Sequence, residues 1–357
     1  MNYLKLMIED RKAEQLAAAV RRIAALKPAA SVLADAGRAL LAANQFTLAK
    51  DLLQQAASTG PRAADVELSL AIATYRATGA EAGLHLLDRL PESERSSGYY
   101  LARAQMLDAS GKLEEAVSAL DQALRAAPER PDSYRQAVAL LASRGRAAEA
   151  LRSIEEGARI LPGNREILLL KASTLEMAGR SSDAEQLLNE IQGRWPEWSP
   201  VWLAHGMILA THQHYEEARQ ALETAAALGA HSPEAYFFLA ECTLRSGAGS
   251  QDAAERLIGQ ALKLSPDDPW ILSLAGRIAF ERGAYPLAVE RLRAAIRRHP
   301  ALIEAHNVLA RAYAALGRKQ EAEFEQDQVR TIQRHSSNED PPYLSRLFQG
   351  SLLDENQ

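Results

Sequence analysis

The chain has 357 residues, of which 47% are hydrophobic and 24% are charged, and its formal net charge is −5. This balance is typical of a soluble protein with a substantial core, and it provides no general attraction to nucleic acid or to an anionic membrane surface. Because Cys242 is the single cysteine, an intramolecular disulfide is excluded and a cysteine-based metal site is not expected.

The first part of the chain, residues 2–27, predicts one helix with an apolar face and a proline after its end. We expect residues 1–29 to form an N-terminal capping helix. The alternative is a repeat array that originally extended upstream of Met1. The apolar face consists of Leu16, Val20, Ile23 and Leu26.

The N-terminus also bears on the compartment. Its first residues, MNYLKLMIED, have an acidic pair after a short apolar run and no small-residue cleavage site, so they are not typical of a signal peptide. No apolar run approaches the roughly 18–20 residues that a membrane-spanning helix needs. We expect a cytoplasmic protein, and a periplasmic location stays open.

From residue 30 onward, a unit of about 34 residues recurs along the chain. In a register numbered 1 to 34, glycine falls at position 15, alanine at position 20 and proline at position 32, as in the units that contain Gly111 and Gly145. Asn44 and Gln213 replace the glycine in two units. The predicted units are 30–63, 64–96, 97–130, 131–164, 165–198, 199–232, 233–268, 269–302 and 303–336.

This recurring pattern of glycine, alanine and proline predicts two antiparallel helices in each unit. The first ends near position 14, because glycine at position 15 accepts the left-handed conformation of a helix C-cap. The second ends before the proline, whose ring disfavours helix in the preceding residue. Small residues at positions 8 and 20 predict a close approach of the two helices. Three Ser-Pro or Asp-Pro pairs, at Ser199, Ser232 and Asp268, predict N-caps followed by proline.

These repeated residues resemble those of tetratricopeptide repeat (TPR) proteins, whose 34-residue unit is a helix–turn–helix. The resemblance covers residues 30–336. It implies an all-α fold, an α–α superhelix that is a solenoid of antiparallel helix pairs with the first helices lining a concave groove. Residues 337–357 are expected to be a separate tail that contains a short amphipathic segment, YLSRLFQGSLL (343–353).

In the family, side chains at positions 2, 5, 9, 12 and 13 of each unit typically face that groove. Carried onto this chain, these positions predict an exposed apolar strip in units five to eight, edged by both charge signs. Such a strip suits an apolar helix or an extended peptide. The candidate groove residues are Leu169, Met177, Leu203, Met207, Phe237, Glu241, Leu244, Arg245, Trp270, Arg277, Phe280, Asn307 and Arg311.

Three interpretations of this strip remain open. It can bind an external peptide or protein, which we favour. It can be occupied intramolecularly by the tail segment 343–353. It can also be ordinary packing inside a tight superhelix. No nucleic-acid partner and no membrane span are expected, and the oligomeric state is open.

Residues that could carry chemistry are few. His205, His212 and His214 form the main histidine cluster, but no cysteine or clustered carboxylate completes a zinc site. Three tryptophans around residue 198 are read as packing between units, with an aromatic cage for a cationic ligand as the alternative. Cys242 is expected to be a buried structural thiol. We therefore predict no catalytic residue, no metal and no cofactor.

The predicted function is a non-catalytic scaffold for protein–protein interaction, which holds a peptide or a partner helix in the groove. The alternative is a substrate-docking or regulatory subunit of an enzyme complex, such as a transferase or a secretion or assembly machinery. A helical-repeat RNA binder is less favoured, because the groove is mixed in charge and half apolar.

Overall fold

The computed structural model describes residues 28–247 and 251–335, together with residues 18, 20, 22 and 26. Over these residues the secondary structure is α-helical, with one short 3-10 helix and no strand, so the predicted all-α fold class is confirmed. None of the described helices is long and apolar enough to cross a membrane. The predicted capping helix, residues 1–29, apart from six residues, and the predicted tail lie outside the described residues.

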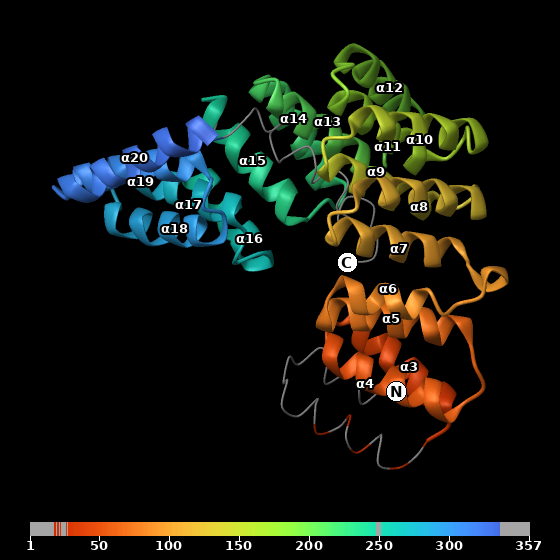
Figure 1. Ribbon diagram of the computed structural model, residues 1–357. Coiled ribbons are helices and arrows are strands. Elements are labelled where there is room, and N and C mark those ends of the chain that lie inside the picture. Colours follow the sequence, from red (N-terminus) through yellow and green to blue (C-terminus); the bar gives the residue numbers. More distant parts are fainter. Residues whose placement is uncertain are drawn as a thin grey trace. The chain divides into compact units, whose positions relative to one another are not determined.

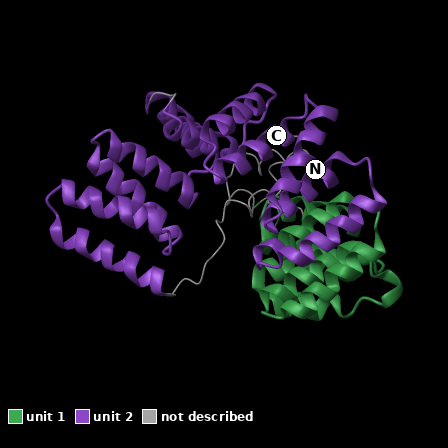
Figure 2. Cartoon of the chain, turned by 90° about the horizontal axis from the view of Figure 1, so that it is seen from above, with its two compact units in different colours: residues 1–141 green, residues 142–357 purple. Residues whose placement is uncertain are grey.

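The chain divides into two compact units, Met1–Leu141 and Ala142–Gln357 (Figure 2). In the first unit, successive helices pack against each other as antiparallel pairs (Figure 1). A 3-10 helix, Glu92–Glu94, connects the second pair to the third. The helices are α3 (Ala30–Ala42), α4 (Phe46–Thr59), α5 (Ala64–Thr78), α6 (Ala80–Leu87), α7 (Ser97–Ala109), α8 (Leu113–Ala126) and α9 (Pro131–Ser143), which crosses into the second unit.

The second unit continues the same arrangement of paired helices. Each predicted 34-residue interval in the described chain contains one helix pair. The helices are α10 (Ala147–Ile160), α11 (Arg165–Met177), α12 (Ser181–Arg194), α13 (Ser199–Thr211), α14 (Tyr215–Ala227), α15 (Pro233–Arg245), α16 (Gln251–Leu264), α17 (Pro269–Glu281), α18 (Tyr285–Arg298), α19 (Ile303–Ala315) and α20 (Lys319–His335).

Position 15 of the repeat is the point at which the chain turns between the two helices of a pair. Every described residue at this position has positive φ, and in Asn44 and Gln213, which have a side chain, φ is 58° and 65°. Asparagine tolerates this left-handed region better than most residues, whereas glutamine adopts it at a cost in strain. The sequence register thus locates the turn even where glycine is missing.

Small residues allow the two helices of a pair to approach closely. A Cβ atom on Gly206 would lie 2.6 Å from Leu222 Cγ, and one on Gly276 would lie 2.5 Å from Leu292 Cγ. Both glycines occupy position 8, opposite the buried alanines at position 20. Larger side chains at either position would separate the helices. The predicted reason for small residues there is confirmed.

The helix ends follow the predicted signals with one exception. Ser232 Oγ accepts a hydrogen bond from the Ala235 amide, and the Asp268 carboxylate accepts from the amides of Trp270 and Ile271. The prediction for Ser199 is wrong: this residue is already helical, and Trp198 occupies the N-cap position without a side-chain cap. Because proline supplies no amide hydrogen, the start of α13 needs fewer capping bonds.

Candidate functional site

The predicted groove residues lie on the first helices of five successive pairs, α11, α13, α15, α17 and α19, all in the second unit. We define the helix-A face as positions 2, 5, 9, 12 and 13 of each first helix. The exposure of this face changes along the chain. We compare the exposure of this face at positions 5 and 9, because these two residues lie about one helical turn apart on the same side of the helix.

In α11, α13, α15 and α17, seven of the eight residues at positions 5 and 9 are buried, and Glu241 is half-buried. In α3, α5, α7, α9 and α19, only two of the ten equivalent residues, Ala34 and Leu101, are buried. We call the eight residues of the first group, together with Glu176 at position 12, the covered face. Its members are Leu169, Ser173, Glu176, Leu203, Met207, Phe237, Glu241, Ser273 and Arg277.

The expectation that the apolar strip is exposed is wrong for its central members. Leu203, Met207 and Phe237 expose 2%, 1% and 2% of their surface, and Leu169 exposes 3%. Repeat register predicts which side of a helix these residues occupy, but it does not predict what covers that side. Whether they contact a ligand stays a prediction. The remaining apolar candidates, Met177, Leu244, Trp270 and Phe280, are half-buried.

The charged candidates form a network across three helices. Arg277 on α17 donates to Glu241 on α15 at 3.1 Å and to Glu304 on α19 at 2.5 Å. Burial alone lowers the pKa of Arg277, but the charges of Glu241 and Glu304 outweigh it and hold this pKa above its usual value. Arg277 therefore remains charged and connects three successive pairs. Arg245 extends the network to Glu241 at 3.5 Å.

The two candidates of the ninth unit are open to solvent. Asn307 and Arg311 on α19 are both exposed. The guanidinium carbon of Arg311 lies 4.6 Å from the centre of the Phe280 ring, a cation–π contact between neighbouring first helices. Phe280 is thereby shielded on one side. The helix-A face thus changes from covered to exposed between α17 and α19.

Two polar side chains of the covered face each have a buried oxygen without a hydrogen-bond partner among the described residues. Glu176 Oε1 accepts from His212 Nε2 at 2.7 Å, whereas its buried Oε2 has no partner among the described residues. Ser273 Oγ is buried and likewise unpartnered in this part of the chain. A buried carboxylate oxygen without a donor is costly, so each such group calls for an explanation. The repeat register places Glu176 among the charged residues of the predicted groove but does not single out Ser273, and a missing partner leaves no signal in the sequence.

The remaining residues singled out for chemistry have structural environments. His205 pairs with Gln192 at 2.8 Å, and burial lowers its pKa despite the opposing charge of Glu185. Burial, aided by the charge of Glu241, raises the pKa of the Cys242 thiol to about 12. A thiol with so high a pKa is a poor nucleophile near neutral pH. No group of three histidine, cysteine or acidic side chains in the described chain is placed to hold a metal ion.

The tryptophans near residue 198 are engaged separately. The Arg165 guanidinium lies 4.7 Å from the Trp198 ring centre, and Arg194 lies 4.5 Å from that of Trp195. Trp202 Nε1 donates to the Pro196 carbonyl at 2.8 Å. Each ring therefore has a partner from the chain itself, in agreement with the packing interpretation.

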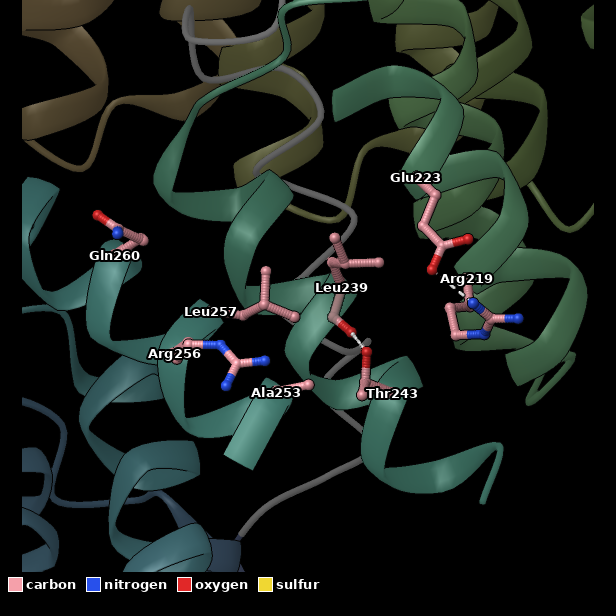
Figure 3. A pocket seen from close by; sticks show the side chains of 8 residues that line it. All are labelled: Arg219, Glu223, Leu239, Thr243, Ala253, Arg256, Leu257 and Gln260. Atoms are coloured by element: carbon pink, nitrogen blue, oxygen red, sulfur yellow. Dashed lines mark hydrogen bonds and ion pairs between the residues drawn. The ribbon is translucent and has the colours of Figure 1, made fainter. Parts of the chain in front are cut away.

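A pocket that sequence analysis did not predict lies among α14, α15 and α16 (Figure 3). Its volume is about 550 Å³, and Leu239 and Thr243 of α15 lie between the residues contributed by α14 and α16. Arg219 is held by Glu216 and Glu223 on its own helix. A similar pocket of about 500 Å³ lies in the next but one pair, between Arg293 of α18, Tyr313 of α19 and Phe324 of α20. Neither pocket includes a residue of the covered face.

Stacked pairs of antiparallel helices, one pair in each repeat interval of the described chain, define a helical-repeat protein. Family models described as tetratricopeptide repeat match residues 101–165, 203–269, 247–302 and 273–329, and a second model of the same description matches residues 141–208. The chain belongs to the tetratricopeptide repeat family, and the predicted resemblance is confirmed.

Curated relatives match over a limited stretch. The cell division cycle protein 16 homolog of Mus musculus is 31% identical over 116 residues, which are 32% of this chain and 18% of that protein. The homolog of Homo sapiens is 30% identical over the same length and the same shares. The match therefore spans less than a fifth of these relatives.

Solved structures share the fold over most of the chain. The Cut9 and Hcn1 hetero-tetramer of the APC/C has a TM-score of 0.55 and 17% identity, covering 86% of this chain and 67% of that one. Yeast Tom70 has a TM-score of 0.60 and 15% identity, covering 87% of this chain and 64% of that one. At this identity the likeness concerns the fold.

Proposed function

We propose that this chain is a non-catalytic scaffold that binds a peptide or a partner helix along the covered face of α11, α13, α15 and α17. The observation that carries the proposal is the makeup of this face. Large apolar side chains such as Leu203 and Phe237 lie in register with Glu176, whose Oε2 has no partner in the described chain. Apolar contacts supply affinity, and a carboxylate selects a ligand that brings a donor or a cation.

A rigid framework supports this role. Arg277 connects α15, α17 and α19, so the side chains of the face are held in place before a ligand arrives. Preorganisation of this kind reduces the ordering cost on the protein side of binding. The groups considered for chemistry, Cys242 and His205, are buried or half-buried and have the raised and lowered pKa values of structural residues. These features favour binding over catalysis.

A docking or regulatory subunit of an enzyme complex would use the same face with a different partner. Cut9 is a fold relative whose structure contains a second protein, Hcn1, and this fits an assembly role of that kind. RNA binding is less favoured, because the covered face contains two acidic residues, Glu176 and Glu241, and one basic residue, Arg277, whereas phosphate contacts require a basic surface. We place the protein in the cytoplasm as part of the same proposal.

The test uses the full chain as bait, followed by affinity measurement with the captured partner. Glu176→Gln keeps the shape of the side chain and removes its charge, so we expect about tenfold weaker binding of a donor-bearing partner, the equivalent of one charge-assisted hydrogen bond. Glu223→Gln at the pocket of α14 is the matched control and should leave affinity unchanged. Weaker binding by Glu223→Gln with unchanged binding by Glu176→Gln would place the binding site at that pocket. Capture of RNA with a steep salt dependence would favour the RNA-binding alternative.

A further inference from the structure

The burial of the covered face needs a physical cause. The same positions on α5, α7, α9 and α19 belong to the same kind of helix pair, yet most of them are exposed or half-buried. Pairing of helices therefore does not by itself bury these positions in this chain. Burial of nearly all of these positions is seen in four consecutive first helices of one compact unit.

The unpartnered polar atoms indicate that the cover is not permanent helix packing. Glu176 exposes 7% of its surface and Ser273 exposes 4%, and each has an oxygen without a donor among the described residues. A face sealed by its own helices would be expected to contain apolar side chains at these points, because a buried oxygen without a partner is destabilising. An occupant that brings hydrogen-bond donors would satisfy them.

The chain itself contains a segment with suitable chemistry. Residues 343–353 contain Tyr343, Leu344, Leu347 and Phe348, and Arg346 is their single charged residue. An apolar segment with one cation is complementary to a face that has large apolar side chains and, at Glu176, a carboxylate oxygen without a partner among the described residues. No acidic residue in the segment opposes this pairing.

The length of the chain after α20 also suits this occupant. The helix ends at His335, and 22 residues follow. Seven residues, 336–342, separate His335 from the segment and reach up to about 25 Å when extended. The eleven-residue segment spans about 16 Å as a helix or about 37 Å extended. Neighbouring helices pack about 8–10 Å apart, so this length corresponds to two to four successive first helices.

We propose that residues 343–353 occupy the covered face of the same chain. The C-terminal segment is then a resident ligand that an external partner must displace. This inference rests on the proposed function, because it assigns the first occupant of the same binding face. It makes the scaffold self-inhibited: the affinity for a partner is reduced by the fraction of chains in which the segment is bound.

The test measures the solvent access of one position on the face in the full chain. Ser273→Cys changes a single atom, and iodoacetamide alkylation of the new thiol is followed by mass spectrometry. Cys242 stays nearly silent in this assay because its pKa is about 12. The rate is compared with and without the tail substitutions Leu347→Asp and Phe348→Asp, which lie beyond α20 and alter no described helix. Asn307→Cys, at an exposed equivalent position, is the matched control.

We expect Ser273→Cys to react slowly with the native tail and at least about tenfold faster with the substituted tail, since a tether that holds the segment near 1 mM and a dissociation constant of about 0.1 mM give about that protection. A synthetic peptide of residues 336–357, added to the substituted chain, should restore protection. Asn307→Cys should react fast in both chains.

Three results would overturn the inference. Equal protection with native and substituted tails would mean that the helices themselves seal the face. Rapid reaction with the native tail would mean that the face is open. Protection that disappears on dilution would assign the cover to a second copy of the chain. An open face or a cover supplied by a second copy would overturn this inference and leave the Glu176→Gln binding test, and with it the proposed function, standing. A face sealed by its own helices would overturn both.

Discussion

His306 on α19 and Glu325 on α20 form a buried pair, with Nδ1 of the imidazole 2.5 Å from Oε2 of the carboxylate. The other ring nitrogen, Nε2, lies 2.9 Å from the carbonyl oxygen of Pro300. A carbonyl oxygen only accepts, so Nε2 must donate, and the proton between Nδ1 and Glu325 completes the arrangement. One imidazole thereby joins the loop before α19 to the last described helix.

Removal of His306 should destabilise the final helix pair. His306→Leu leaves the Glu325 carboxylate buried without its partner, and we expect a loss of about 3 kcal/mol. Glu325→Gln should cost about 1 kcal/mol, because an amide N–H can still donate to Nδ1 of a neutral imidazole. Hydrogen exchange of the α19 and α20 amides measures this local effect, since terminal repeats open independently. Equal losses in the two variants would contradict the arrangement.

Arg277 should contribute to stability through its two glutamates. Arg277→Met leaves Glu241 and Glu304 without their shared cation, and we expect a loss of about 1–3 kcal/mol, discounted because Glu304 is partly exposed. Arg277→Lys keeps the charge but cannot serve both carboxylates with one planar group, so its loss should be intermediate. Urea unfolding followed by circular dichroism gives the order. A methionine variant as stable as the native chain would mean that the network is energetically neutral.

From the close packing within helix pairs, we expect two glycine substitutions to change stability in opposite directions. In Gly276→Ala the new methyl group would meet Leu292 Cγ at 2.5 Å, and we expect a loss of about 1–3 kcal/mol. In Gly259→Ala, on α16, nothing lies within 4 Å of the added atom, so helix propensity should raise stability by up to about 1 kcal/mol. Thermal unfolding of the two variants should shift in opposite directions. A shift of the same sign in both would refute the packing argument.

The buried thiol predicts a stability change at alkaline pH. Cys242 has a pKa of about 12 in the folded chain, raised by burial, whereas an unfolded cysteine titrates near 8.5. Between these values the unfolded chain has released a proton that the folded chain keeps. Stability therefore falls as pH rises above about 8.5, by up to about 1.4 kcal/mol per pH unit, and this contribution is fully present below that pH.

Comparison with Cys242→Ala isolates this contribution from the titration of other groups. The free energy of unfolding of the native chain should decline relative to that of the alanine variant between about pH 8.5 and 10.5. A constant difference between the two proteins across this interval would show that the folded thiol ionises normally.

Much of the fold could be predicted from the sequence, because the repeat positions have local physical meanings. A left-handed turn at position 15 holds even for Asn44 and Gln213, and small residues at position 8 lie against a leucine of the partner helix. Such requirements recur in every unit and reinforce one another. The N-cap at Ser199 was mispredicted, since Ser-Pro permits the helix to start at the serine itself.

The site was less predictable, because its decisive features join residues one or more repeats apart. His212 lies 36 residues from Glu176, to which it donates, and no local pattern indicates that Glu176 Oε2 lacks a partner. The burial of Leu203 and Phe237 depends on what covers them, which a helix period cannot specify. The pocket beside Arg219 arises from the spacing of three helices and has no sequence signal.

The most direct measurement of the central claim, that the covered face is a ligand-binding surface, is photo-crosslinking from Met177, which is half-buried beside Glu176. A photoreactive phenylalanine at this position in the full chain should form adducts with residues 343–353 when the tail is native. With Leu347→Asp and Phe348→Asp, in lysate, it should form adducts with a partner protein. Adducts confined to neighbouring helices such as α13, whatever the tail, would show that the face is internal packing and would contradict the claim.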